Sequence, residues 1–172
     1  MKALIIILFL SVTIASYSQE TTKGKIKIEE LPGVVIKRVG SDFSVYIPDN
    51  NPDQRVRTVE EKFIAFDLGK DAEGFEEYLV VMEVKNGSLT ASYNENGKLI
   101  RVVEEFKNVK LPGEVIYSIY RAYPGWSIVN DSFLYSQSEG DVIKKQYNIK
   151  IKKDKETVKL VVRPNGEIIK AK

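Results

Sequence analysis

The C-terminal third of the chain begins with a helical pattern of apolar residues. They recur at steps of three to four positions, at Val115, Ile116, Ile119, Tyr120 and Tyr123. This spacing is typical of a helix with one buried face. Pro112 fits the first turn of such a helix, and Pro124 ends it because proline disfavours helical geometry in the residue before it. The pattern therefore predicts a helix between these two prolines.

Beyond this helix the apolar residues alternate with polar ones, which predicts strands with one buried face. The buried positions are Tyr147, Ile149 and Ile151, followed by Val158, Leu160 and Val162. The polar positions between and beside them are Lys144, Gln146, Asn148, Lys150 and Lys152, followed by Lys159 and Arg163. We expect this polar set to line the outer face of a sheet whose other face carries the helix.

The first half of the chain carries a similar series of patterns. A weaker helix is expected around Gly40, because glycine costs about 1 kcal/mol relative to alanine within a helix. Strands are expected at residues 63–68, 78–84 and 89–93. Asn-Gly pairs, which favour two-residue hairpin turns, begin at Asn86, Asn96 and Asn165. The strands are therefore expected to form antiparallel meanders.

Two segments of the chain resemble each other from start to end. The sequence LPGVVI at residues 31–36 is matched by LPGEVI at 111–116, and NENGKLI at 94–100 is matched by RPNGEII at 163–169. When the two segments are aligned on these matches, Tyr46 corresponds to Trp126. Matches in the same order predict an internal repeat. The sequence therefore predicts an α+β fold of two tandem units, residues 19–106 and 107–172, each a helix packed on a roughly four-stranded antiparallel meander sheet.

Residues 1–18 have the features of a secretion signal. Lys2 is followed by an unbroken apolar run from residue 3 to residue 10, and the small residues Ser16 and Ser18 precede a cleavage site. The run is shorter than the roughly 20 apolar residues of a membrane-spanning helix. We therefore expect a signal peptide and a periplasmic or secreted protein with no membrane anchor after cleavage.

The composition excludes several kinds of function. The chain has no histidine and no cysteine, which removes Ser-His and Cys-His catalysis, the common zinc sites and disulfides. With 26 basic against 24 acidic residues, the chain lacks the strong basic excess of nucleic-acid-binding proteins. Adjacent glutamates, such as those at 60–61 and 104–105, point in different directions and are expected to be solvated surface. No catalytic residue, metal ligand or cofactor is predicted, and we expect the protein not to be an enzyme.

Two acidic loops, at residues 49–53 and 71–77, concentrate the oxygen ligands that calcium prefers. Neither loop has the spacing of an EF-hand. Asp and Asn side chains in such loops also bond to their own backbone in turns. A small-ligand or calcium-binding periplasmic carrier is therefore the alternative functional hypothesis.

Candidate partner-binding residues come from two features. The densest aromatic stretch of the chain contains Tyr117 and Trp126, and Tyr117 falls off the apolar stripe of its helix. Aromatic residues anchor many interfaces, and they also pack into cores. The outer sheet face adds four basic residues: Lys150, Lys152, Lys159 and Arg163. These fit an acidic partner as well as a plain solvated face.

The sequence resembles the PepSY-like, β-lactamase-inhibitory-protein-like family of secreted bacterial proteins. The resemblance rests on residues 93–100, 111–112, 123–126 and 163–169, and the first unit matches more loosely. It implies tandem helix-plus-four-stranded-sheet units, a periplasmic or secreted location and no enzymatic activity. In inhibitory proteins of similar fold, the outer sheet face grips a target enzyme through aromatic and charged side chains. The disulfides of those inhibitors are absent here, and no inhibitory loop matches residue by residue.

The leading functional hypothesis is therefore a non-catalytic periplasmic or secreted module, either binding or inhibitory. It would hold a protein or peptide on its outer sheet face. No nucleic-acid partner is expected.

Overall fold

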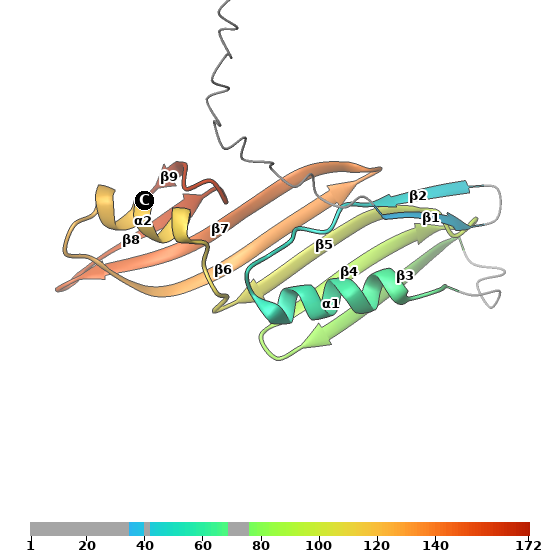
Figure 1. Cartoon of the computed structure of the whole chain (residues 1–172), viewed down its shortest axis with the longest axis horizontal. Helices are drawn as coiled ribbons and strands as arrows, with labels where there is room; N and C mark the ends of the chain where they lie inside the picture. The colour runs from blue at the N-terminus through green and yellow to red at the C-terminus, as the bar shows by residue number, and fades with distance from the viewer. Residues whose placement is uncertain (1–34, 40–41, 69–75) are drawn as a thin grey trace, which may run out of the picture. The chain divides into compact units, whose positions relative to one another are not determined.

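The computed structural model describes residues 35–39, 42–68 and 76–172 (Figure 1). All of them belong to one unit, Pro32–Lys172. Their elements follow in the order β1 (Val35–Val39), β2 (Asp42–Tyr46), α1 (Gln54–Ala65), β3 (Glu77–Val84), β4 (Gly87–Asn94), β5 (Leu99–Lys107), α2 (Gly113–Ala122), β6 (Ser127–Ser138), β7 (Asp141–Lys153), β8 (Glu156–Val162) and β9 (Ile168–Ala171).

Seven strands, β3 to β9, form one antiparallel sheet in which the spatial order equals the chain order. Strands β1 and β2 pair only with each other, as a separate antiparallel hairpin. The turns at Asn86, Asn96 and Asn165 each join neighbouring antiparallel strands, as their Asn-Gly pairs predict. The α+β class and the meander connections are therefore confirmed.

Two predictions for the first half of the chain are wrong. Residues 35–39 and 42–46, on the two sides of Gly40, form strands β1 and β2 instead of a helix, so Tyr46 in β2 is not the structural counterpart of Trp126. Val35 and Ile36 are β-branched residues, which fit a strand better than a helix. Residues 63–65, predicted to begin a strand, end helix α1.

Helix α1 carries a helical signal of its own. Asp53 caps it, since its side chain accepts a hydrogen bond from the backbone N–H of Arg55. Val56, Val59 and Phe63 are buried at helical spacing, and Glu60 is buried beside them. Because Glu60 occupies one of these buried positions, it interrupts the apolar stripe, and the helical pattern is not recognised from the sequence.

A helix followed by a meander occurs twice in the chain, as α1 with β3–β5 and α2 with β6–β9. The strands of both segments hydrogen-bond in one sheet through β5 and β6, so they do not form two separate four-stranded sheets. The division of the chain at residue 107 stays a prediction. The expected signal peptide, residues 1–18, lies outside the described residues, and none of the described helices is long and apolar enough to cross a membrane.

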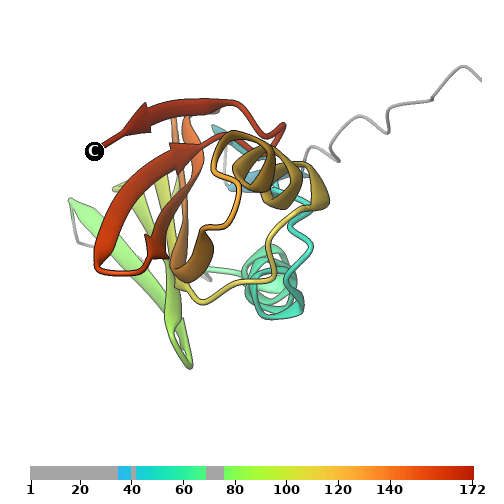
Figure 2. The same ribbon diagram turned by 90° about the vertical axis from the view of Figure 1, so that its left-hand side faces the viewer.

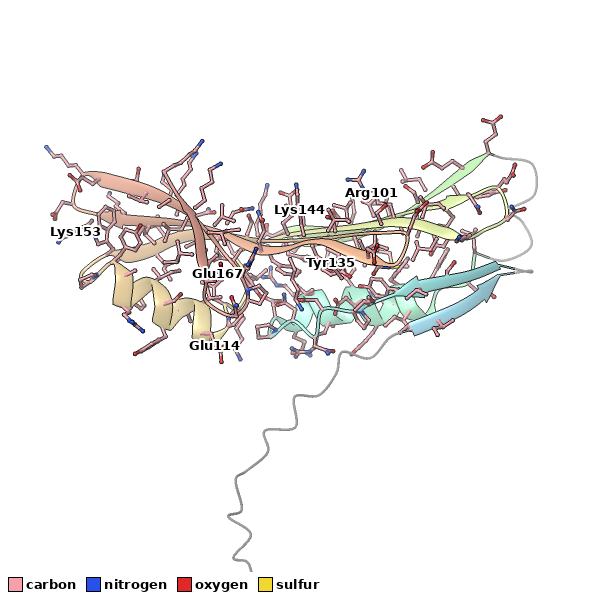
Figure 3. All side chains as sticks on the ribbon, turned by 90° about the horizontal axis from the view of Figure 1, so that it is seen from above. Arg101, Glu114, Tyr135, Lys144, Lys153 and Glu167 are labelled. Carbon is pink, nitrogen blue, oxygen red and sulfur yellow. The ribbon has the colours of Figure 1, made fainter. Side chains whose placement is uncertain are left out.

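Both helices cover the same face of the seven-stranded sheet (Figures 2 and 3). The core lies between this face and the helices, and its buried strand residues include Leu89, Val102, Phe106, Phe133, Tyr147, Ile149, Ile151, Leu160 and Val162. Helix α2 buries Val115 and Ile119 fully. Tyr120, predicted to be core, is 48% exposed, because only one edge of the apolar stripe faces the sheet.

The turn between β8 and β9 packs directly against the start of α2. Gly166 in this turn has φ +86°, in the left-handed region that favours glycine. A Cβ atom at this position would lie 2.6 Å from the carbonyl oxygen of Glu114, in the first turn of α2. The absence of a side chain at Gly166 therefore allows this close approach.

We expect Gly166→Ala to lower the free energy of unfolding by about 1 to 3 kcal/mol, because alanine is strained at this φ and meets the α2 backbone. Gly113→Ala is the matched control, since a Cβ atom there meets nothing within 4 Å. Urea denaturation of both variants measures the difference. Equal stability of the two variants would show that the turn does not pack on α2 in this way.

Candidate functional site

The sheet face opposite the helices, here called the outer face, carries the polar set predicted from the alternation in β7. Ile149 and Ile151 are buried on the helix side, so Lys150 and Lys152 point to the outer face. Figure 3 shows Arg101 and Lys144 on this side of the sheet, away from both helices. Lys159 of β8 shares the face, because it lies directly opposite Lys150.

Of the other three predicted partner-binding residues, Tyr117 and Trp126 lie elsewhere. Tyr117 is 68% exposed, but on α2 and so on the helix side of the sheet. Trp126 is half-buried and packs edge-on against Tyr123, with ring centroids 5.9 Å apart. Arg163 forms an ion pair with Glu167 at 2.7 Å. The structure therefore brings together Lys150, Lys152 and Lys159 only, and the part of all six residues in binding stays a prediction.

An open depression of about 390 Å³ lies on the outer face of β6–β9, and we call it the basic depression. Its lining residues are Asn130, Ser132, Asn148, Ile149, Lys150, Lys159, Leu160, Val161, Lys170 and Lys172. Among the described residues that line it, only the four lysines have an ionisable side chain. The depression therefore offers positive charge, amides and a hydroxyl to a ligand.

Three of these lysines form a row across the strands. Lys150 of β7 lies opposite Lys159 of β8, and Lys159 exchanges two backbone hydrogen bonds with Lys172, at 2.7 and 2.9 Å. Ion pairs in the described part of the chain join Arg55 to Asp53, Lys145 to Asp49 and Arg163 to Glu167, so no carboxylate within 4 Å balances this row. Like charges directly opposite each other on a sheet are destabilising.

Lys170 and Lys172 were missed from the sequence. They follow the last Asn-Gly turn in the sequence Ile169-Lys170-Ala171-Lys172, in which apolar and charged residues alternate as in one more strand. Strand β9 has only four residues, 168–171, which is too short for the alternation to be recognised as a strand.

The acidic loop at residues 49–53 uses its oxygens internally. Asp49 pairs with Lys145 at 2.5 Å and accepts a hydrogen bond from the side-chain amide of Asn51 at 2.8 Å. Asp53 caps α1 and accepts a hydrogen bond from the backbone N–H of Lys110 at 2.8 Å. Within the described ranges, no group of three or more acidic side chains is arranged to hold a metal ion. Of the second acidic loop, residues 71–75 lie outside these ranges.

Two glutamates predicted to be solvated surface are buried between α1 and the sheet. Glu60 of α1 is 3% exposed and Glu104 of β5 is fully buried. The hydroxyl of Tyr46 donates a hydrogen bond to Glu104 Oε1 at 2.7 Å and lies 3.5 Å from Glu60 Oε1. Glu60 Oε1 also accepts the backbone N–H of Asp49 at 2.7 Å. Because both carboxyl groups are shielded, they serve the packing of β2 and α1 rather than a bound substrate.

Burial sets the protonation of these groups. It raises the pKa of Glu60 to about 7, and the nearby Asp49 carboxylate acts in the same direction. Burial, and then the charge of Glu60, raise the pKa of Glu104 well above its usual range. Within the described structure Glu104 Oε2 has no hydrogen-bond partner, so burying the charged form is costly and the neutral acid is favoured. By contrast, burial of Asp53 is outweighed by hydrogen bonds from Arg55 and Lys110, which lower its pKa to about 2.

We expect the free energy of unfolding to fall as the pH rises from about 4.5 to 8. The folded protein binds protons at Glu60 and Glu104 more tightly than the unfolded chain does, so the stability present below about pH 4.5 is lost as the pH passes through the raised pKa values. For Glu60 alone the loss is of the order of 3 kcal/mol. Urea denaturation across this pH range measures it.

Glu104→Gln keeps the shape of the side chain without its charge. The free energy of unfolding of this variant should therefore decrease less as the pH rises, and it should be higher at pH 8 than that of the unchanged protein. Glu105→Gln, at an exposed position of the same strand, is the matched control and should keep the fall seen in the unchanged protein. Stability that rises with pH over this range would contradict the burial of the two glutamates.

We expect Lys159→Gln to stabilise the protein by about 0.2 to 1 kcal/mol at low salt, because it removes the central charge of the lysine row. The gain should shrink at about 1 M salt, where the screening length is only about 3 Å. Lys155→Gln, in the turn before β8, is the control and should show a smaller gain. Thermal unfolding at both salt concentrations tests this, and a salt-independent loss of stability in Lys159→Gln would argue against repulsion in the row.

Comparison with known proteins finds distant structural likenesses. The chain is similar to a DUF2874 family protein from Bacteroides ovatus, with 16% sequence identity, a TM-score of 0.37, and coverage of 72% of this chain and 88% of that chain. It is also similar to a BLIP-like protein from Bacteroides fragilis, with 13% identity, a TM-score of 0.34, and coverage of 58% and 70%. A protein from Bacteroides eggerthii that is thought to be periplasmic matches with 10% identity, a TM-score of 0.33, and coverage of 69% and 86%.

No family model matches the chain, and no match is found among curated proteins. The similar structures thus include a BLIP-like protein, whereas a PepSY-like relationship is not shown.

Proposed function

We propose that this protein is a non-catalytic binding module outside the cytoplasm, which holds a protein or peptide on its outer sheet face. The observation that carries the proposal is the basic depression, where four lysines gather and none of the described lining residues is acidic. A row of like charges works against folding. Such a row is explained if it is balanced by a ligand instead of by the protein itself.

The rest of the outer face supports a macromolecular ligand. Both helices lie on the other face of the sheet, so its outer face is left uncovered by them (Figure 3). On β3, Tyr78 and Val80 pack against the core, which turns Leu79 and Val81 outward, and these are 65% and 49% exposed. A partner that spans the sheet would contact apolar side chains at β3 and charged ones at β7 to β9.

Location and chemistry agree with this role. The predicted signal peptide at residues 1–18 supports export. The chain lacks histidine and cysteine, and its carboxyl groups with strongly raised pKa values are shielded from substrates. The calcium-carrier alternative loses support at loop 49–53, because the oxygens of that loop are bound by Lys145, Arg55 and backbone N–H groups.

Site-directed crosslinking tests which face binds. Because the chain has no cysteine, Asn148→Cys places a single thiol in the basic depression, and Ala122→Cys places one at the exposed end of α2. Each variant is labelled with a benzophenone maleimide and irradiated in extracytoplasmic extract of the source cells. We expect a discrete adduct from the label at residue 148, suppressed by excess unlabelled protein, and none from the label at residue 122. An adduct from residue 122 alone, or no adduct from either position, would overturn the proposal.

A further inference from the structure

The basic depression has a geometry that restricts the chemistry of its ligand. The depression is open, its volume is about 390 Å³, and it lies over the middle of β7 and β8 and along β9. Lysines approach it from three strands: Lys150 from β7, Lys159 from β8, and Lys170 with Lys172 from the end of the chain. Asn130 lies opposite Lys150 on β6 and extends the row with an amide. The positive charge is therefore spread over a surface instead of being focused on one point.

The spacing of the lysines matches an extended chain. Neighbouring strands lie about 4.8 Å apart, so the row from Lys150 through Lys159 to Lys172 extends over about 10 Å. Along a strand, residues two apart are separated by about 6.6 Å. Lys150 and Lys152 have this separation on β7, as do Lys170 and Lys172 next to β8. Carboxylates at alternate positions of an extended peptide have the same separation.

Other anions fit less well. A single phosphate group is best oriented by guanidinium forks or by free backbone N–H groups. None of the described lining residues is an arginine, and the strands β7 and β8 beneath the depression are paired on both sides. Single-stranded nucleic acid usually stacks its bases on aromatic side chains, and none of the residues that line the depression in the described part of the chain is aromatic. Lysines on flexible stems, by contrast, suit several separate carboxylates.

We propose that the basic depression binds an acidic segment of a protein partner in extended conformation. This inference rests on the proposed function and specifies its partner. The segment carries Asp or Glu at alternate positions, and their carboxylates take the place of the missing acidic neighbours of Lys150, Lys159, Lys170 and Lys172. Asn130 and Asn148 supply amides to its backbone.

Binding of a labelled oligoglutamate peptide of about ten residues, which extends over about 33 Å, tests this inference by fluorescence anisotropy. An oligoglutamine peptide of equal length is the uncharged control. We expect the protein to bind oligoglutamate and not oligoglutamine, and to bind it less tightly as salt is raised from about 10 mM to about 1 M. The double variant Lys150→Gln with Lys159→Gln should weaken binding about tenfold or more.

The matched control variant is Lys153→Gln with Lys155→Gln, which removes the same charge next to the depression but outside its lining. It should change binding by less than about twofold. If both double variants bind oligoglutamate equally weakly, the effect depends only on net charge and the inference is overturned. Tighter binding of inorganic phosphate or oligothymidylate than of oligoglutamate, competing at the same lysines, would overturn it in favour of a phosphate-bearing ligand.

Failure of this inference can be separated from failure of the proposed function. Crosslinking from residue 148 does not depend on the charge of the partner. If a specific adduct still forms while oligoglutamate does not bind, the outer face binds a partner that is not acidic. If neither the adduct nor oligoglutamate binding is seen, both proposals fall.

Discussion

The hydrogen bond from Tyr46 to the buried Glu104 is the contact on which the first half of the structure depends. Strand β2 shares no backbone pairing with the seven-stranded sheet, so side chains have to join the two. The side-chain amide of Gln137 bonds to the backbone of Val45 and Ile47, at 2.6 and 3.0 Å, as a neighbouring strand would do. Without these polar contacts, buried backbone groups of the segment after β2 would lack partners.

Two further side-chain hydrogen bonds position the connection that leads to α2. Asp53 begins α1 and at the same time holds the backbone of Lys110, while Asp131 of β6 accepts the backbone N–H of Val109 at 2.7 Å. The chain therefore enters α2 from a fixed point, and α2 closes the core over β6 to β8. Placing both helices on one face leaves the other face of the sheet to interact with its surroundings.

The predictable parts of this fold are those in which local pattern and tertiary environment agree. Strands β7 and β8 bury one face and expose the other, and α2 has an apolar stripe between two prolines, so periodicity identified them. Helix α1 was missed because Glu60 occupies a core position, and its burial makes sense only next to Tyr46 and Asp49, which other segments supply. The burial of Glu104 is equally non-local, since its partner lies 58 residues away in the chain. For the candidate site, alternation predicted the outer lysines of β7 and β8, whereas the contribution of β9 required the sheet order.

In the proposed binding role, strand β9 would separate stability from specificity. Of its residues only Ile168 is packed against the core, and the others are exposed. Its exposed residues can therefore change with little penalty in folding, while a substitution of Lys170 would alter the charge at one side of the basic depression. If the basic depression binds as proposed, homologues that share this core would exchange one partner for another through substitutions in a single short strand.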